Sequence, residues 1–514
     1  MLLRQWGAAV LLLVLLCGLT DALGATVLIT SKPYARSHHL NGLRLARALH
    51  ERGHRVGMVV SALDDTFMAK HAADMPYLHQ LREPSDYTEE MVRSIFDQVE
   101  KKSNLEMLTM MVERLRTAEP CPYTDLMLSQ CRDFQPDMLV IDGASPCPYI
   151  WAEKLGLPHI SFLPVQPLQP ILSIHHDVPM SPARWPCMGS GYNPYAPSFL
   201  GRLGNQMTTY MTVAAWQVFT VQSSFAKAGM PELSYSAAAR RSRAVLILSD
   251  PLLDHPAPMP SNVKSIGALL PHEGGELEIE LAALLERAGG RSVYMSFGTT
   301  GVGGLSARPF IDVWAQLPNV TVIWKVSNAS DAAFSEAAKL PNVRLVEWVD
   351  QNAMLGHPDL GMFLTHGGHN SISEAAFHGV PILAVAIFGD QWESAARAKF
   401  HGFGESLDKR MLRSEVIKEH VVKVLENDGY KQAAARLSRG MKLFRKRRHP
   451  VDSAVDLIED EIEAVKEDAA SFPLPLPPLR WWQNSQVDVH VALALLLVLG
   501  GGALARLLLC CYDH

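Results

Sequence analysis

The sequence predicts an α/β protein with two doubly wound halves, because strand and helix patterns alternate in both halves of its 514 residues. Near the start, the apolar run 25–29 is typical of a strand, 41–52 has helical periodicity, and 55–61 begins a second strand. Gly53 ends the helix between them. Together these elements predict one βαβ unit of a parallel sheet.

The first half continues with the same alternation. The apolar run 137–141 predicts a strand that ends at Asp142, and we expect a helix at 147–155 and another strand at 157–163. The segment 250–275 is rich in proline and ends in Gly-Gly. Because such residues interrupt helices and strands, we expect this segment to be the linker between the halves.

The second half is expected to begin with a helix at 277–288 and a strand at 291–297. The strand leads into the glycine-rich loop 298–304, where the absence of a Cβ lets backbone amides approach a phosphate. The glycine spacing is not the dinucleotide-binding fingerprint, and an ordinary flexible turn explains this loop when it is taken alone. We interpret it as a phosphate-binding wall only together with the segment that follows.

A second phosphate-binding pattern lies near residue 366. The apolar run 362–364 breaks at Thr365-His366-Gly367-Gly368 into an expected helix, on which His366, Asn370 and Glu374 would share one face. Unpaired amides and the dipole at such a helix start suit a diphosphate, while Asn370 and Glu374 suit ribose hydroxyls. A capped helix with a solvated polar face explains each residue singly. Their joint spacing favours a nucleotide-sugar site.

The longer segment around this pattern resembles the signature of the UDP-glycosyltransferases, the glucuronosyltransferase-like family of animals and its relatives. The resemblance implies that Trp348 stacks on uracil, Gln351 contacts the nucleoside and Glu374 holds the ribose. It also implies that His366 contacts the diphosphate and that the Asp-Gln pair 390–391 grips the sugar hydroxyls. The donor-site residues implied in this way are Ser296, Gly298, Thr299, Trp348, Gln351, His366, Gly368, Asn370, Ser371, Glu374, Asp390 and Gln391.

The resemblance covers nearly all of the expected mature chain and implies the GT-B fold, in which two Rossmann-like domains face each other with the ligand between them. An acceptor-binding domain would occupy 25–249 and a UDP-sugar-binding domain 276–470. The sequence departs from the family pattern at Asp350, where many members carry proline, and at His369. Neither departure removes a contacting group. The resemblance is faint between 62 and 130, where no residue is assigned a role.

The donor segment contains no base, and the first half offers one. His38 follows the first strand and Asp142 ends another, and ligands of open α/β sheets gather at such strand ends. An imidazole titrates near neutral pH, and an adjacent carboxylate can orient it. The resemblance implies this catalytic pair, and the family interval to Arg-Gly-His favours His38 over His39. A loop histidine without a role is the alternative that the residues alone leave open.

The composition and the spacing of cysteines and asparagines indicate which partners and modifications to expect. The chain has 53 acidic and 47 basic residues and a net charge of -6, which gives no electrostatic footprint for nucleic acid. The cysteines Cys121, Cys131, Cys147 and Cys187 allow one or two disulfides, whose pairing stays open. No His/Cys spacing resembles a zinc site, so we predict no metal ligands. Sequons begin at Asn319 and Asn328 and predict a glycoprotein.

Both ends of the chain carry membrane signals. Residues 1–24 combine a basic start, an apolar stretch and small residues near the end, as a cleavable signal peptide requires. Residues 491–511 are interrupted only by Arg506 and at about 1.5 Å per residue would span roughly 30 Å of hydrocarbon. A buried core helix is the alternative. A juxtamembrane linker at 471–490 and a cytosolic tail at 512–514 complete a single-pass type I protein with its domains in the lumen of the endoplasmic reticulum or secretory pathway.

The expected function is that of an inverting, metal-independent glycosyltransferase, without a cofactor, that moves a hexosyl or glucuronosyl group from a UDP-sugar to a hydroxyl. Adaptable apolar residues predict a small lipophilic acceptor, although core packing explains them as well. They are Met180, Met188, Met207, Met211 and Trp216. The donor sugar stays open among glucuronate, glucose and N-acetylglucosamine. The alternative is a catalytically silent membrane protein that binds UDP-sugars or assembles with active relatives. A UDP-sugar epimerase or a phosphorylase of the same fold is a weaker alternative, because soluble enzymes of those kinds need neither a signal peptide nor a membrane anchor.

Overall fold

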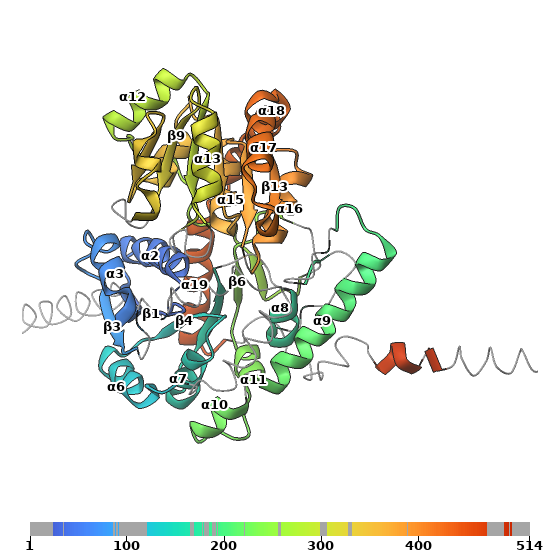
Figure 1. Cartoon of the computed structure of the whole chain (residues 1–514). Coiled ribbons are helices and arrows are strands. Elements are labelled where there is room, and N and C mark those ends of the chain that lie inside the picture. The colour runs from blue at the N-terminus through green and yellow to red at the C-terminus, as the bar shows by residue number, and fades with distance from the viewer. Residues whose placement is uncertain are drawn as a thin grey trace, which may run out of the picture.

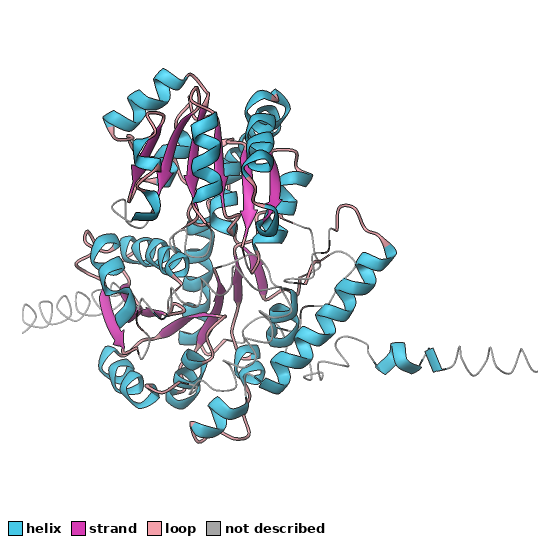
Figure 2. Cartoon of the chain, viewed as in Figure 1, coloured by secondary structure: helices cyan, strands magenta, loops and turns pink. Residues whose placement is uncertain are grey.

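The structure is a computed structural model of the chain. The residues that it describes are 24–33, 35–85, 88, 91, 121–164, 169–176, 178, 185–187, 192, 194–219, 222–254, 259–298, 306–326, 332–387, 389–469, 488–492 and 494–495. They form two α/β domains, one above the other in Figure 1. Figure 2 shows that each domain has a sheet flanked by helices on both faces. The expected pair of doubly wound halves is therefore confirmed.

The amino-terminal sheet is parallel and has the order β3-β2-β1-β4-β5-β6-β7. Its strands are β1 (Thr26–Ile29), β2 (Arg55–Ser61), β3 (His79–Glu83), β4 (Met138–Asp142), β5 (His159–Leu163), β6 (Val245–Ile247) and β7 (Val263–Ser265). Because β1 lies between β2 and β4, the order of the strands reverses there. A reversal of this kind leaves a crevice beyond the carboxyl ends of the two central strands.

The carboxyl-terminal sheet repeats this plan with the order β10-β9-β8-β11-β12-β13, again parallel. Its strands are β8 (Ser292–Ser296), β9 (Thr321–Lys325), β10 (Val343–Val346), β11 (Met362–Thr365), β12 (Ile382–Ala386) and β13 (Gly404–Asp408). The order reverses at β8 and β11, which are paired in register from Val293 and Met362 onward. Both central strands are fully buried, as expected for a parallel sheet covered on two faces.

The amino-terminal helices are α2 (Arg36–Glu51), α3 (Asp65–His71), α6 (Thr124–Phe134), α7 (Cys147–Leu155), α8 (Gln169–His176), α9 (Phe199–Phe219), α10 (Gln222–Lys227) and α11 (Tyr235–Arg240). The expected helix at 147–155 is confirmed with the same bounds. The helix expected from residue 41 begins earlier, because its first turn buries His38 and His39 instead of apolar side chains. A pattern of apolar residues does not detect such a turn.

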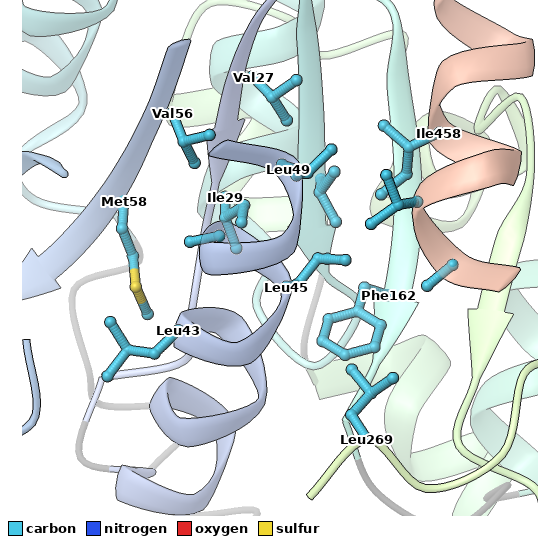
Figure 3. Close-up of a cluster of buried hydrophobic side chains, with 14 of the residues drawn as sticks. Val27, Ile29, Leu43, Leu45, Leu49, Val56, Met58, Phe162, Leu269 and Ile458 are labelled. Atoms are coloured by element: carbon cyan, nitrogen blue, oxygen red, sulfur yellow. The ribbon is translucent and has the colours of Figure 1, made fainter. Parts of the chain in front are cut away.

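The carboxyl-terminal helices are α12 (Ile279–Ala288), α13 (Arg308–Gln316), α14 (Gln351–Gly356), α15 (His369–His378), α16 (Gln391–Phe400), α17 (Ser414–Glu426), α18 (Asp428–Arg445) and α19 (Pro450–Lys466). The last of them, α19, packs in the core of the other domain. Ile458 of α19 is fully buried in the same cluster as Val27 of β1 and Leu45 and Leu49 of α2 (Figure 3). Burial of such a side chain stabilises the fold by about 1.5–3 kcal/mol.

The packing of two segments differs from the expected division of the chain. Residues 450–466, which we placed in the second domain, pack with the first. The segment 250–275, expected as a linker, contributes β7 to the amino-terminal sheet, where Leu246 pairs with Lys264. Apolar periodicity identifies a helix or a strand, but it does not say which sheet or core the element joins.

Cys121 and Cys147 form a disulfide that ties the start of α7 to the residues just before α6, whereas Cys131 and Cys187 are free and buried. The sequon residue Asn319 is exposed, and Asn328 lies outside the described residues. The expected signal peptide, 1–24, and the expected span, 491–511, also lie almost entirely outside them. Within the part of the chain that the structure describes, no helix is both long and apolar enough to cross a membrane.

Candidate active site

His38 and Asp142 meet beyond the carboxyl ends of the neighbouring strands β1 and β4. His38 lies in the first turn of α2 and Asp142 is the last residue of β4, and the His38 Nδ1 atom is 2.6 Å from Oδ2 of Asp142. Both side chains are buried. The neighbouring His39 instead contacts the Ala35 carbonyl and approaches Asp64. The structure thus brings together the two residues expected as base and orienting acid.

Asp142 is held by donors on both carboxylate oxygens. The Lys32 amide donates to Oδ2 at 2.8 Å and the Ala144 amide donates to Oδ1 at 3.0 Å. Burial alone raises the pKa of Asp142, but His38 and these amides outweigh it and hold the pKa below its ordinary value. The carboxylate is therefore ionised near neutral pH. It favours the His38 tautomer that donates from Nδ1, which leaves a lone pair on Nε2.

His366 lies in the loop between β11 and α15, not on the helix where we expected it. Gly367 has φ of 82° and Gly368 is the extended N-cap residue, so the helix begins only at His369. The imidazole fits between two glycines. A Cβ on Gly298 would lie 2.8 Å from its Cε1 atom, and a Cβ on Gly368 would lie 2.5 Å from Nε2. Burial, with Lys325 nearby, lowers the pKa of His366 to about 4, so its imidazole is neutral near pH 7.

Glu374 is the centre of an amide network. Gln351 Nε2 donates to one carboxylate oxygen at 2.6 Å and Asn352 Nδ2 donates to the other at 2.9 Å. Burial raises the pKa of Glu374 to about 7, against the effect of these two donors. Asp350, the departure from the family pattern, accepts from the amides of Asn352 and Ala353 and so caps α14, the helix that carries both amide side chains.

Trp348 is surrounded by cationic and aromatic groups from both domains. The Nζ atoms of Lys325 and Lys70 each lie 4.5 Å from the centre of the indole ring, and the His71 ring centre lies 4.4 Å away. Lys325 ends β9, whereas Lys70 and His71 end α3 of the amino-terminal domain. Figure 1 shows α2 and α3 on the side of that domain that faces the other one. The ring expected to stack on a base therefore lies between the domains.

Positive charge is concentrated at this point. Burial lowers the pKa of Lys325 to about 8, and Lys70 and Arg36 act in the same direction while Glu374 opposes them. Burial and the same neighbouring cations lower the pKa of His71 to about 4. Like charges gathered around one lysine are unfavourable without an anion. The arrangement is suited to an anionic ligand, and such strongly shifted groups are common at functional sites.

Asp390 and Gln391 lie at the start of α16. Gln391 Oε1 accepts from the Ile387 amide at 2.7 Å, which fixes the end of β12 against this turn. Burial raises the pKa of Asp390 to about 6, and the charge of His38 opposes this rise. An electrostatic effect of this kind requires proximity. The expected base of one domain therefore lies near enough to the expected sugar-binding acid of the other domain to influence its pKa.

The remaining expected donor residues lie around the same strand ends. Ser296 ends β8, and its hydroxyl accepts from the Gly298 amide at 3.4 Å. Ser371 accepts from Gln351 at 3.5 Å. The side-chain carbonyl oxygen of Asn370 is buried and makes no hydrogen bond with the residues that the structure describes. Thr299 lies outside the described residues. His369, the second departure from the family pattern, contacts the Leu248 carbonyl at 2.9 Å.

Two of the four methionines expected near the acceptor lie on the protein surface. Met207 and Met211 are each 56% exposed on the outer face of α9, so these two do not line an interior acceptor cavity. Met180 and Met188 lie outside the described residues, as does the side chain of Trp216. The structure therefore removes part of the evidence for a methionine-lined acceptor pocket.

Four residues of the site were not identified from the sequence: Arg36, Lys70, Lys325 and Asn352. Lys325 had a detectable signal, because it is the last residue of an apolar strand and so lies at the carboxyl edge of the sheet. Asn352 adjoins the expected Gln351. Lys70 and Arg36 had none, since they reach Trp348 and Lys325 only through the packing of the two domains.

Comparison with known proteins gives the family. The family model described as "UDP-glucoronosyl and UDP-glucosyl transferase" matches residues 25–512. UDP-glucuronosyltransferase 3A1 of Xenopus laevis is 26% identical over 424 residues, which cover 78% of this chain and 78% of that protein. The human 2-hydroxyacylsphingosine 1-beta-galactosyltransferase is 25% identical over 437 residues, which cover 81% of this chain and 76% of that protein.

Solved structures agree on the fold. A UGT2 of Phytolacca americana, solved with UDP-2fluoro-glucose and pterostilbene, superposes with a TM-score of 0.58 at 15% identity and covers 86% of this chain and 100% of that one. Os79 of O. sativa, solved with UDP, gives a TM-score of 0.58 at 20% identity and covers 85% and 100%. These neighbours are GT-B glycosyltransferases, so the chain has the GT-B fold. Because the family model extends over almost its entire length, the chain belongs to the UDP-glucoronosyl and UDP-glucosyl transferase family of UDP-sugar glycosyltransferases.

Proposed function

We propose that this protein is an inverting glycosyltransferase that moves a sugar from a UDP-sugar to a hydroxyl of a small lipophilic acceptor. The observation that carries the proposal is the buried contact of His38 with Asp142, 2.6 Å apart, at a place where His38 also influences the pKa of Asp390. The proposal is supported by an imidazole that Asp142 orients and by its electrostatic effect on the Asp390 carboxyl group, which is expected to bind the sugar. Such a pair is suited to removing a proton from a bound hydroxyl.

In the proposed reaction, Nε2 of His38 accepts the proton of the acceptor hydroxyl, because Nδ1 is already committed to Asp142. The acceptor oxygen then forms a bond to C1 of the sugar while the bond from C1 to the diphosphate oxygen breaks. The imidazolium that results is stabilised by the ionised Asp142 carboxylate. One displacement of this kind inverts the configuration at C1. Nucleophilic catalysis has no support in the sequence, which contains no serine or cysteine elbow.

The leaving diphosphate is proposed to lie at the ends of β8 and β11, against Ser296 and His366. The neutral His366 donates a hydrogen bond, and Lys325 and Lys70 supply the positive charge. Preorganised donors and cations can stabilise a developing negative charge without a divalent ion. We therefore propose that transfer is metal-independent. The buried, unpaired Asn370 oxygen is available to accept a hydrogen bond from a donor hydroxyl.

We further propose that the two domains lie in the lumen of the secretory pathway, tethered by the apolar residues 491–511. The support is the apolar composition of that segment together with the signal-peptide pattern at 1–24. The disulfide between Cys121 and Cys147 is consistent with an oxidising compartment. A lipophilic acceptor is consistent with the name of the human galactosyltransferase relative, which refers to an acylsphingosine.

The test uses the full chain in microsomes with a panel of UDP-sugars and lipophilic alcohols. We expect UDP release and a conjugate whose new bond has the inverted configuration, both detected by mass spectrometry and NMR. His38→Ala should abolish transfer but leave UDP affinity within about threefold, whereas His79→Ala, at an exposed histidine of β3, should change neither. Full turnover by His38→Ala would exclude His38 as the base. UDP binding without turnover by the parent chain would favour the silent binding protein.

A further inference from the structure

Helix α9 has an inverted distribution of polar and apolar side chains. Its outward face carries five large apolar residues, which we call the α9 stripe. The stripe consists of Phe199, Leu200, Leu203, Met207 and Met211, which are between 46% and 75% exposed. The last four recur every three or four residues and so follow one side of the helix. The inward face buries polar residues instead: Asn205, Thr209 and Thr212 are at most 6% exposed.

Hydrogen bonds fix this orientation of the helix. The Asn205 side chain accepts from the Cys187 amide at 2.7 Å and donates to the Trp185 carbonyl at 2.8 Å. The Thr209 hydroxyl donates to the Asn205 carbonyl at 2.7 Å. The Thr209 bond lies within the helix, but rotation of α9 to hide the stripe would break both Asn205 bonds and leave the Cys187 amide and the Trp185 carbonyl without this partner, which is unfavourable. The exposed apolar surface is therefore specified by the fold itself.

The charge around the stripe favours a lipid surface. No aspartate or glutamate occurs between Asp177 and Glu232, although the chain contains 53 acidic residues among 514. The same interval contains Arg184, Arg202 and Lys227. Phosphate groups of a bilayer are therefore not repelled by this segment, and large apolar side chains on one face of a helix enter the boundary between headgroups and acyl chains.

We infer that the α9 stripe lies on the surface of a lipid bilayer, with the helix axis along the membrane plane. The inference rests on the proposed tether at 491–511, which would hold the domain next to a bilayer and raise the effective concentration of the stripe there. Figure 1 shows α9 at the outer edge of the amino-terminal domain, on the side toward which residues 488–492 also extend.

This contact would place the bilayer next to the acceptor side of the site. Tyr195, four residues before α9, stacks on Phe400 with ring centres 3.7 Å apart. Phe400 is the last residue of α16, the helix that begins at Gln391. The segment that leads into α9 therefore contacts the helix that carries the expected sugar-binding glutamine. An acceptor dissolved in the membrane would then reach the site along the surface that α9 and α16 form where Tyr195 contacts Phe400.

The experiment places the full chain in nanodiscs of phosphatidylcholine with a minor share of phosphatidylserine and a phospholipid that carries a photoactivatable diazirine in its acyl chain. Labelled peptides are mapped by mass spectrometry, and UDP affinity is measured on the same sample. We expect residues 199–211 to be labelled at least fivefold more than Ile279 and Leu443, which are 88% and 65% exposed on the other domain. These two serve as equally accessible apolar controls.

A matched pair of variants tests the stripe directly. The double substitution Leu203→Glu with Met207→Glu should reduce labelling of 199–211 at least fivefold, because carboxylates are excluded from the apolar layer, whereas Ile279→Glu should leave it unchanged. Labelling of 199–211 no higher than at Ile279 overturns the inference, as do cross-links between two copies through the stripe. Absent labelling with normal UDP affinity refutes only the α9 contact, whereas strong labelling without UDP binding refutes the proposed function and leaves the contact standing.

Discussion

The ammonium group of Lys70 lies 4.5 Å from the centre of the Trp348 ring, although the two residues belong to different domains. Lys325 lies at the same distance from the ring, so two cations and the ring form one cluster across the domain interface. Without an anion these charges repel each other. A bound diphosphate would offset the repulsion, and the amino-terminal domain would then contribute Lys70 to donor binding.

Replacing either lysine therefore tests whether the cluster serves the donor. We expect Lys325→Gln and Lys70→Gln each to weaken UDP binding about tenfold at low salt, because each removes one charge facing a diphosphate in a partly desolvated site. Both variants should also show a weaker dependence of the dissociation constant on ionic strength. Calorimetric titration at two salt concentrations measures both effects. Lys339→Gln, at an exposed lysine, is the control.

Gly298 and His366 offer a test of the phosphate pocket. Gly298 has φ of 84° and its Cα faces the imidazole, whereas Gly290 has φ of 88° with open space around it. Alanine at either position strains the backbone by roughly 1–2 kcal/mol, but only Gly298→Ala also displaces His366. We therefore expect both variants to lower the melting temperature similarly and only Gly298→Ala to lose UDP affinity, by tenfold or more. Equal UDP affinity in the two variants would contradict the assigned place of His366.

The sequence predicted the elements that bring the site together, because the strands of a parallel sheet are apolar runs bounded by turn residues. Strand 55–61 and helix 147–155 have the expected bounds, and Asp142 ends its strand as expected. The orientation of α9 was not predictable from apolar periodicity, since its polar face is the buried one. The place of α19 was not predictable either. This helix follows the carboxyl-terminal domain in the sequence but packs in the core of the amino-terminal domain.

The candidate site was predictable where one short segment carries it and not where two domains meet. The spacing around residue 366 identified Glu374. In the structure the Gln351 side chain donates to the Glu374 carboxylate, so two residues expected to bind the nucleoside are in contact. The same spacing wrongly placed His366 on the helix. Gly367 forms a turn and Gly368 is the N-cap, so the helix begins only at His369. Lys70 lies in an interval without any motif, and only the packed structure shows that it reaches Trp348.

Asp142 is expected to act through His38 and not by contact with substrate. Asp142→Asn keeps the size of the side chain but replaces an acceptor of the His38 proton with an amide, which can stabilise the wrong tautomer. The corresponding change in a serine protease triad lowers kcat about 10⁴-fold, so we expect a loss of at least 10³-fold in kcat here. KM and UDP affinity should change less than threefold, because Asp142 contacts His38 and the amides of Lys32 and Ala144, which are not among the residues expected to bind the donor. Steady-state kinetics measures kcat and KM, and calorimetry measures UDP binding. General unfolding would lower kcat and UDP binding together, whereas the expected result is a loss of kcat alone.

Glu374 should make the ligand-free protein less stable as the pH rises. Its pKa is about 7 in the folded chain and 4.5 as the reference value, so between these values the folded chain binds more protons than the unfolded one. Stability contributed by the protonated form is then present below pH 4.5 and lost as the pH rises through 7. Between pH 5 and 8 we expect the parent to lose about 1–3 kcal/mol more unfolding free energy than Glu374→Gln.

Urea denaturation at several pH values measures this slope, and the exposed Glu347→Gln serves as a control that should keep the parental slope. The slope is a better readout than the absolute stability, because the new amide also rearranges the hydrogen bonds from Gln351 and Asn352. Saturating UDP-sugar should reduce the slope of the parent, since ribose hydroxyls that donate to the Glu374 carboxylate favour its ionised form. A parental slope in Glu374→Gln, with or without donor, would show that Glu374 is not the group that titrates in this range.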